Sequence, residues 1–383
     1  MSFLSYLLFR LFTFPLQFLS YKTLHRLGNM LGLVVYHCYP KYRKRALSNL
    51  ALATDLHLSP EQIVETAKKS LQSLAITALE YPRLSRENDI HQLATCENPD
   101  LAAKMMSEGQ PIIFFCGHQT NWEILFLEGT KRMPGVAIGR PIKNKYIYRW
   151  IVALREKFGG TIVRPTNAYK ECFRGLKQGK FVGIVGDQGM PGSGFSSPFL
   201  GRLAWTSPLP ALLSSRTGCP IMVATTRREL GKYIIHYSDP IWPTEDPHDQ
   251  MREVLKVFEA TVKERPHEWL WIHNRWKQQP PGKLHKKYRH DSIAFIFPEE
   301  PSDLYQIREL YPTEHITAFA KTPSHHKDIE MKSHDDLFSR DYRFKMVVDF
   351  TQNPTLQKHF KNLSAQSIFS YSNPEEFIAH ARR

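Results

Sequence analysis

The first 54 residues of this 383-residue chain contain no aspartate or glutamate. The first acidic residue is Asp55, and seven lysines and arginines precede it. From residue 283 onward, 15 basic residues nearly balance 14 acidic ones, so almost all of the formal net charge of +14 belongs to the first 282 residues. Such a charge calls for an anionic partner, which could be phospholipid headgroups, a phosphorylated substrate, an acidic carrier protein or nucleic acid.

Cysteine is also scarce, with five residues and no C-x-x-C pair. This scarcity argues against a disulfide framework and against a cysteine-based metal site, and we expect reduced, buried thiols in a cytosolic compartment. Cys116 lies two residues before His118, which leaves a Cys/His nucleophilic pair open. Alternation along a strand favours burial of Cys116 instead. The cysteines are Cys38, Cys96, Cys116, Cys172 and Cys219.

The chain lacks an uninterrupted apolar run at its N-terminus. Residues 2–21 have about the length of a membrane-spanning helix, but Arg10 lies near the middle and Pro15 would kink the segment. The order of features in a signal peptide is absent. We expect residues 1–25 to form a retained membrane anchor helix, spanning or interfacial, with the basic run at 41–45 on the cytoplasmic side. An amphipathic helix on a soluble core is the alternative.

Apolar periodicity changes along the next part of the chain. Ser59 and Pro60 mark the start of a helix. Short apolar runs at 111–118, 181–187 and 220–226 are typical of buried strands. Helical patterns separate or follow them, so residues 26–280 predict an α/β domain with helices covering a mostly parallel sheet. The helical ranges are 143–158, 167–178, 208–217 and 248–265.

No glycine-rich nucleotide fingerprint occurs near the C-terminus. Residues 278–290 have the composition of a linker, and strand and helix patterns alternate beyond them. We therefore expect residues 281–383 to contain a linker and a small Rossmann-like α/β domain that is separable from the chemistry.

The segment GHQTNWE at 117–123 concentrates the candidate chemistry. On one continuous helix, five residues turn through roughly 500°, so His118 and Glu123 would point about 140° apart. We therefore expect His118 in a turn and Thr120 as the cap of a helix, from which Glu123 reaches back to hold the imidazole. A histidine held by a carboxylate is a general base. The alternative is a capping box of Thr120 and Glu123, with His118 as an ordinary loop residue.

GHQTNWE has the His-x4-acid form shared by glycerolipid acyltransferases, and its context resembles the lipid A late acyltransferase family. Further segments resemble that family in the same order, and the resemblance covers residues 1 to about 280. Pro208, Pro210 and the extension of about 100 residues depart from the family pattern. The matching segments are ALSNLALA at 46–53, GRPIKN at 139–144, GDQG at 186–189, PFLGRLAWT at 198–206 and PHEWLWIHNRWK at 266–277.

The resemblance implies a role for eight residues, without a cofactor or a metal. His118 is expected to be the base and Glu123 its partner, with Asp187 and Arg155 as further catalytic residues. The position of Asp187 after an apolar strand agrees, because functional groups gather at the carboxyl ends of strands in open α/β sheets. Arg155 could equally belong to a solvated helix face. The expected substrate-binding residues are Arg140, Arg164, Arg275 and Lys277.

The family also implies the reaction. We expect an acyl chain to pass from acyl carrier protein to a hydroxyl of a 3-hydroxyacyl chain on a lipid A precursor, at the cytoplasmic face of a bacterial inner membrane. Two alternatives are an acyltransferase that acts on a lysophospholipid or other glycolipid, and a non-catalytic membrane-surface binding module. Nucleic acid is not expected as a partner, because no recognition motif accompanies the basic charge.

Overall fold

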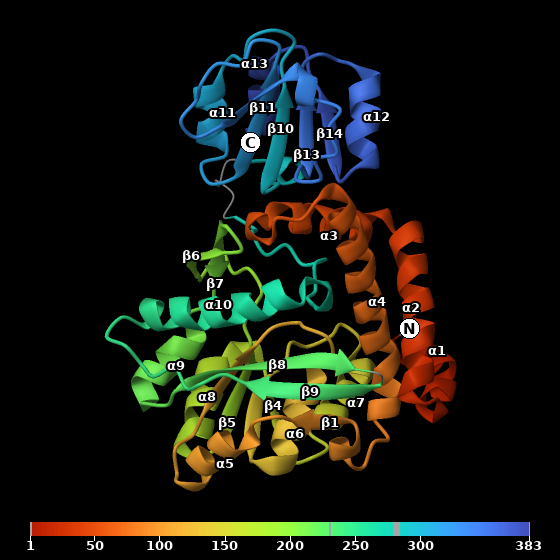
Figure 1. Ribbon diagram of the computed structural model, residues 1–383, viewed down its shortest axis with the longest axis vertical. Coiled ribbons are helices and arrows are strands. Elements are labelled where there is room, and N and C mark those ends of the chain that lie inside the picture. The colour runs from red at the N-terminus through yellow and green to blue at the C-terminus, as the bar shows by residue number, and fades with distance from the viewer. Residues whose placement is uncertain (1, 230, 279–283, 383) are drawn as a thin grey trace. The chain divides into compact units, whose positions relative to one another are not determined.

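The computed structural model describes residues 2–229, 231–278 and 284–382 (Figure 1). Contacts divide the chain into two compact units. The first unit comprises Met1–Val34, Lys68–Gln188 and Thr206–Leu270, and the second comprises Val35–Ala67, Gly189–Trp205 and Trp271–Arg383. This division groups the C-terminal extension with two segments that the sequence had assigned to the preceding domain. Residues 279–283 of the expected linker lie outside the described residues.

A seven-stranded sheet with the order β1-β9-β8-β2-β5-β3-β4 organises the first unit. Neighbouring strands pair in parallel except β8 and β9, so the expected mostly parallel sheet is confirmed. The strands are β1 (Ala94–Cys96), β2 (Ile113–Cys116), β3 (Gly135–Ile138), β4 (Thr161–Val163), β5 (Phe181–Val185), β8 (Ile221–Glu229) and β9 (Lys232–Tyr237).

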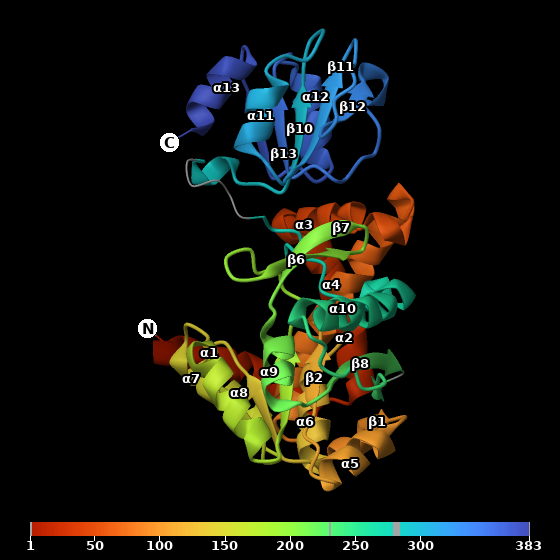
Figure 2. The same cartoon turned by 90° about the vertical axis from the view of Figure 1, so that its left-hand side faces the viewer.

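Helices cover both faces of this sheet (Figures 1 and 2). Alternation along β2 shows why, since successive side chains of a strand point to opposite faces. Phe114 joins the core formed with α5 and α6, whereas Phe115 packs edge-to-face on Phe258 of α10 with ring centroids 5.6 Å apart. The helices are α5 (Pro99–Ser107), α6 (Glu123–Arg132), α7 (Lys145–Arg155), α8 (Ala168–Lys177), α9 (Leu209–Thr217) and α10 (Pro247–Glu264).

The N-terminal segment does not form the single helix that we expected to anchor the chain. Helix α1 (Ser2–Thr13) ends before Pro15, and a 3-10 helix, η1 (Phe14–Phe18), leads to α2 (Tyr21–Cys38). The ring of Phe9 packs edge-to-face on Trp150 of α7. No helix within residues 2–229, 231–278 and 284–382 combines the length and hydropathy needed to cross a membrane, so a spanning N-terminal helix is not supported.

A five-stranded, fully parallel sheet forms the C-terminal part of the second unit, in the order β12-β11-β10-β13-β14. This order agrees with the Rossmann-like arrangement expected from the sequence. The strands are β10 (Ser292–Ile296), β11 (His315–Ala320), β12 (Glu330–Ser333), β13 (Met346–Asp349) and β14 (Ser367–Ser370). Helices α11 (Leu304–Leu310) and α13 (Pro374–Ala381) share one core with the sheet, and α12 (Pro354–Asn362) shares the other.

Helix α3 (Pro40–Leu52) belongs to the same unit and shares hydrogen bonds with this sheet domain. The fully buried Lys345 donates to Oδ2 of Asp291 and to Oδ1 of Asn49, each at 2.8 Å. Asn49 in turn donates to the carbonyls of Trp271 and His273. The unit also contains β6 (Phe195–Phe199), β7 (Arg202–Thr206) up to Trp205, and part of α4 (Pro60–Leu84).

Candidate active site

Two neighbouring strands bring His118 and Asp187 together. His118 follows β2 and Asp187 follows β5, which pairs with β2 in parallel. Nδ1 of His118 lies 2.7 Å from Oδ1 of Asp187, and the backbone N–H of His118 donates to Oδ2 of Asp187, also at 2.7 Å. The indole N–H of Trp269 donates to the same Oδ2 at 2.7 Å. Three interactions therefore hold the Asp187 carboxylate beside Nδ1 of the imidazole.

The electrostatics of the pair favour charge on both groups. Burial by itself lowers the pKa of His118, but the adjacent Asp187 carboxylate outweighs it and raises that pKa above its ordinary value. Burial raises the pKa of Asp187, whereas His118 and the hydrogen bonds from His118 and Trp269 lower it more, so the net direction is strongly downward. The His118 side chain is 17% exposed, and its Nδ1 is engaged by Asp187. Nε2 is thus the nitrogen available for proton transfer.

The turn that carries His118 has little freedom. A Cβ atom at Gly117 would meet the Phe258 ring at 2.1 Å, so only glycine fits there. Thr120 has a φ of +43°, a left-handed conformation that is rare for a β-branched residue. Its N–H donates to the Glu268 carbonyl and its own carbonyl accepts from Thr77, both at 2.8 Å. These bonds hold a strained turn in place.

The structure corrects the expected partner of Glu123. Its carboxylate receives two hydrogen bonds from Arg155, at 2.7 and 2.5 Å, and one from Tyr81 at 2.7 Å. Thr120 does not cap α6, which begins at Glu123, and the N–H of Thr120 is not bonded to Glu123. The capping box is therefore absent as well. Asp187, rather than Glu123, holds the imidazole.

A buried ion pair results from this arrangement. The Glu123 side chain is 3% exposed and Arg155, at the end of α7, is 20% exposed. Burial raises the pKa of Glu123, but the Arg155 guanidinium outweighs it and the net pKa is lowered. After Asp187, Glu123 also raises the pKa of His118 through space, whereas Arg155 lowers it, so the two partners act on the imidazole in opposite directions. Arg155 thus lies in the site rather than on a solvated helix face.

Sequence reasoning missed several side chains that complete the site. The Gln188 amide nitrogen lies 3.5 Å from Nε2 of His118. Asn121 donates to the buried Glu80 at 2.8 Å, and its own Oδ1 accepts from the N–H of Glu123. Gln188 and Trp269 lie in segments that resemble the family. Their contacts join segments that are distant in the chain, so no spacing in the sequence could identify these two residues as part of the site.

Cys116 is not part of the reacting group. Its thiol is buried and donates to the Ile184 carbonyl at 3.7 Å. Burial raises the pKa of the thiol strongly, so a thiolate nucleophile is disfavoured. The Cys/His pair that the sequence left open is therefore not favoured by the structure.

The expected substrate-binding residues differ in exposure. Arg140 and Arg164 are exposed after β3 and β4, and Lys277 is exposed in the second unit. Arg275 is fully buried, with its guanidinium 4.8 Å above the Phe199 ring and a hydrogen bond to the Trp205 carbonyl. Arg275 therefore packs inside its unit, which does not fit the substrate contact that we expected.

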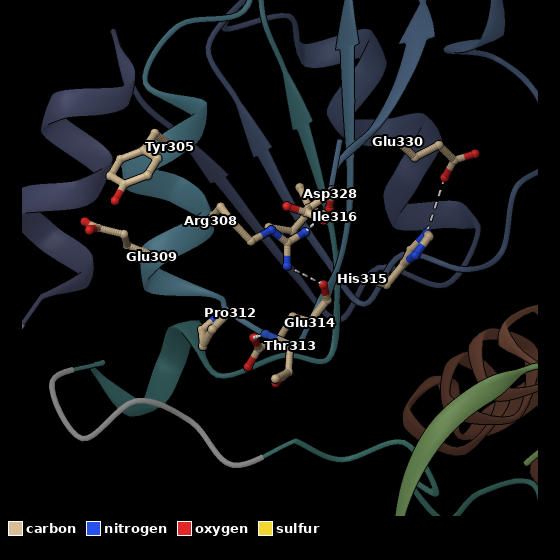
Figure 3. Close-up of a pocket in the computed structure, with 10 residues that line it drawn as sticks. All are labelled: Tyr305, Arg308, Glu309, Pro312, Thr313, Glu314, His315, Ile316, Asp328 and Glu330. Carbon is tan, nitrogen blue, oxygen red and sulfur yellow. Dashed lines mark hydrogen bonds and ion pairs between the residues drawn. The ribbon is translucent and has the colours of Figure 1, made fainter. Parts of the chain in front are cut away.

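A separate cavity of about 600 Å³ lies in the C-terminal sheet domain, beside the starts of β11 and β12 (Figure 3). Arg308 donates to the backbone carbonyl of Glu314, whose side chain also lines the cavity. Burial raises the pKa of Glu314 to about 7. Acidic side chains predominate in the lining, so this cavity does not suit an anionic lipid.

Comparison with known proteins agrees with the resemblance of the sequence. The model of the bacterial lipid A biosynthesis acyltransferase family matches residues 2–278. A lipid A biosynthesis acyltransferase of Haemophilus influenzae is 24% identical over 273 residues, which cover 68% of this chain and 84% of that protein. A lipid A biosynthesis palmitoleoyltransferase of Escherichia coli is 23% identical over 280 residues, covering 69% and 88%. The chain belongs to the bacterial lipid A biosynthesis acyltransferase family.

Proposed function

We propose that this acyltransferase moves a fatty acyl chain from acyl carrier protein to a hydroxyl of a 3-hydroxyacyl chain on a lipid A precursor. Family membership supports lipid A acyl transfer, and the contact between His118 and Asp187 carries the mechanistic part of the proposal. An ester-forming reaction of this kind needs a base, because the hydroxyl must lose its proton as it attacks the carbonyl.

In the proposed mechanism, Nε2 of His118 takes the proton of the acceptor hydroxyl. The oxygen attacks the thioester carbonyl carbon, and a new C–O bond forms as the carbonyl becomes an oxyanion. Collapse of this intermediate breaks the C–S bond, and the imidazolium returns its proton to the departing thiolate. Asp187 stabilises the imidazolium and fixes the ring. The Gln188 amide is our candidate donor to the oxyanion.

We assign positioning roles to Glu123 and Arg155. Their bidentate pair joins the start of α6 to the end of α7. We propose that it holds the start of α6, and with it the preceding turn that carries His118, in a fixed position. The exposed Arg140, Arg164 and Lys277 are proposed to attract the phosphorylated acceptor and the acidic carrier protein. We retain residues 26–280 as the proposed acyltransferase domain and residues 281–383 as its extension.

The N-terminal helices are proposed to bind the membrane interface at the cytoplasmic face of the bacterial inner membrane. Large apolar side chains cover the exposed surfaces of α1 and η1, with Leu11 68% and Phe12 78% exposed. Apolar groups at this density favour insertion beside lipid headgroups, and the basic residues around them favour an anionic leaflet. Further exposed apolar residues of α1 and η1 are Phe3, Leu4, Leu7, Leu8, Phe14 and Phe18.

A donor panel tests the proposed reaction. The purified protein in detergent would receive a lipid A precursor and acyl carrier proteins loaded with chains of different length, and mass spectrometry would identify the product. We expect the mass of one acyl chain to be added to the precursor. A lysophospholipid or another glycolipid as the better acceptor would contradict the proposed substrate but leave the acyltransferase chemistry standing. Absence of transfer from any thioester would contradict both.

A further inference from the structure

The first unit has a second concave site, which lies outside the catalytic residues described above. It has a volume of about 420 Å³ and is bounded by α2, α4, β8 and the 3-10 helix η5 (Pro266–Glu268). We call it the α2–α4 pocket. Its ionisable lining residues are Lys22, His25, Arg26, Lys69, Arg228, His267 and Glu268.

Permanent positive charge dominates this lining. Four lysine and arginine side chains face one carboxylate, that of Glu268, and burial raises the pKa of this carboxyl group. Burial first, and then the neighbouring Lys69, lowers the pKa of His267, so this imidazole stays neutral where the cations already repel a further positive charge. An excess of permanent cations in a pocket favours a ligand with more than one negative charge.

Arg228 is less exposed than the other three cations. Its guanidinium donates to Oη of Tyr233 at 2.9 Å and to Oγ of Ser73 at 2.9 Å, and a third bond reaches Thr77 at 3.1 Å. These acceptors are neutral, and no carboxylate forms an ion pair with Arg228 within the described part of the chain. Burial lowers the pKa of Arg228, but Tyr233 and then the carboxylates of Glu80 and Glu268 outweigh burial and raise it. The charge of Arg228 is therefore oriented by neutral hydrogen-bond partners and only partly compensated by carboxylates nearby.

Helix α2 joins the pocket to an apolar surface. Gly28 and Gly32 pack on α4, where any Cβ atom would come within 2.5 Å of Ile76 or 2.3 Å of Gln72. A second side of α2 lines the pocket with residues at helical spacing, which are Lys22, His25, Arg26 and Asn29. The third side of the helix is apolar and exposed, at Leu27, Met30, Leu31 and Val34.

Arg26 and Met30 connect the pocket to the apolar side, because residues four apart are neighbours on a helix surface. Met30 is 67% exposed, although its side chain is apolar. A cationic pocket beside an exposed apolar strip matches a molecule with a phosphorylated headgroup and acyl chains, as found in a membrane lipid.

We propose that the α2–α4 pocket binds the phosphomonoester headgroup of a membrane lipid, while the apolar strip of α2 lies among the acyl chains. A phosphomonoester carries close to two negative charges at neutral pH and three acceptor oxygens, which suits this excess of cations better than a singly charged phosphodiester does. The inference goes beyond the proposed function, since the binding requires no acyl transfer.

The test compares two kinds of vesicle of equal surface potential. Both contain phosphatidylcholine, one with phosphatidic acid as the phosphomonoester and the other with phosphatidylglycerol as the phosphodiester. We expect the full-length protein to bind the phosphatidic acid vesicles about tenfold more tightly. Lys22→Gln combined with Arg26→Gln should remove this preference. Both side chains are exposed, so the variant should fold, which circular dichroism would check.

A matched control removes two charges elsewhere. Lys104 and Lys256 are exposed on α5 and α10, and replacing both by Gln should leave the preference intact. If both double variants lose the preference for phosphatidic acid equally, the proposal is overturned, because the preference would then depend on total charge and not on this pocket. Absence of a preference in the unmodified protein would overturn it too. Glycerol 3-phosphate provides the last arm: if it raises the melting temperature as much as phosphatidic acid does, the ligand is a soluble phosphate and not a lipid.

Discussion

Nδ1 of His118 lies 2.7 Å from Oδ1 of Asp187, although 69 residues separate them along the chain. The contact arises because their strands, β2 and β5, are parallel neighbours and both residues follow the carboxyl ends. It sets the tautomer of the imidazole, since an N–H at Nδ1 leaves Nε2 free to accept a proton. The first two predictions depend on this contact.

Replacement of His118 by Ala should lower turnover by about 10²–10⁴-fold, because it removes the general base. Asp187→Asn should lower it to a similar degree, and the double variant should be little slower than either single one if the two residues act as a unit. Turnover per folded molecule is the measurement, with folding followed by thermal melting. Near-normal turnover of folded His118→Ala would contradict the proposed mechanism.

The pH dependence of kcat/KM should report His118. Because the pKa of His118 is raised, the acidic limb of the profile should lie above the ordinary value of about 6.5. Asp187→Asn removes the carboxylate that raises this pKa and leaves the effect of burial, so the limb should move to lower pH. A limb that stays in place in Asp187→Asn would show that another group titrates.

The Glu123–Arg155 pair should matter more for stability than a surface ion pair does. Removing either partner leaves a buried charge without its counterion, and we expect each of Glu123→Ala and Arg155→Ala to cost about 3–5 kcal/mol of unfolding free energy. Removing both charges, with Glu123→Gln and Arg155→Met, should cost less than the sum. Denaturant unfolding measures these values, and additive costs would contradict the coupling.

A matched surface pair provides the control. Glu171 and Arg174 form an ion pair on α8 with the arginine side chain 52% exposed. Replacing either residue by Ala should change the unfolding free energy by about 0–1 kcal/mol.

Acid should unfold the protein partly through Asp187 and Glu123. Both pKa values are lowered in the folded state, so the stability that these carboxylates contribute is fully present above their unfolded values of about 3.9 and 4.3. It is lost as the pH falls below those values toward the folded ones. His118 has the opposite sign, since its raised pKa contributes stability below about 6.5 that is lost as the pH rises through the folded value. Melting curves of Asp187→Asn should therefore depend less on pH in both ranges.

Removal of the C-terminal extension should leave acyl-transfer activity intact but lower the stability of the protein. A chain ending at Gln278 loses the partners of α3 residues Lys44, Ser48 and Asn49, which bond to Ala365, Arg343 and Lys345. Unsatisfied buried groups cost about 1–3 kcal/mol each, so the melting temperature should fall clearly. Turnover per folded molecule should remain near that of the full chain. A folded fragment without any transfer activity would show that the extension completes the site.

The sequence by itself determined the elements and the family. Apolar runs and helix signals are local, so they indicated β2, β5, β8 and most helices, and Pro60 begins α4 as expected from its capping pattern. Charge and the absence of acidic residues before Asp55 pointed to an anionic surface partner. The His-x4-acid segment was recognisable because its residues are adjacent in the chain.

Only the tertiary structure decided which carboxylate serves the histidine. Glu123 is five residues away but lies on a helix whose direction takes it to Arg155 and Tyr81, whereas Asp187 arrives on a neighbouring strand. Strand order is a long-range property that no local spacing encodes. Helix α1 ends before Pro15 for a local reason, because proline cannot continue the hydrogen bonds of a helix, and this break divides the anchor helix that we expected. Packing between distant segments, by contrast, places Arg275 over Phe199 rather than in a substrate contact.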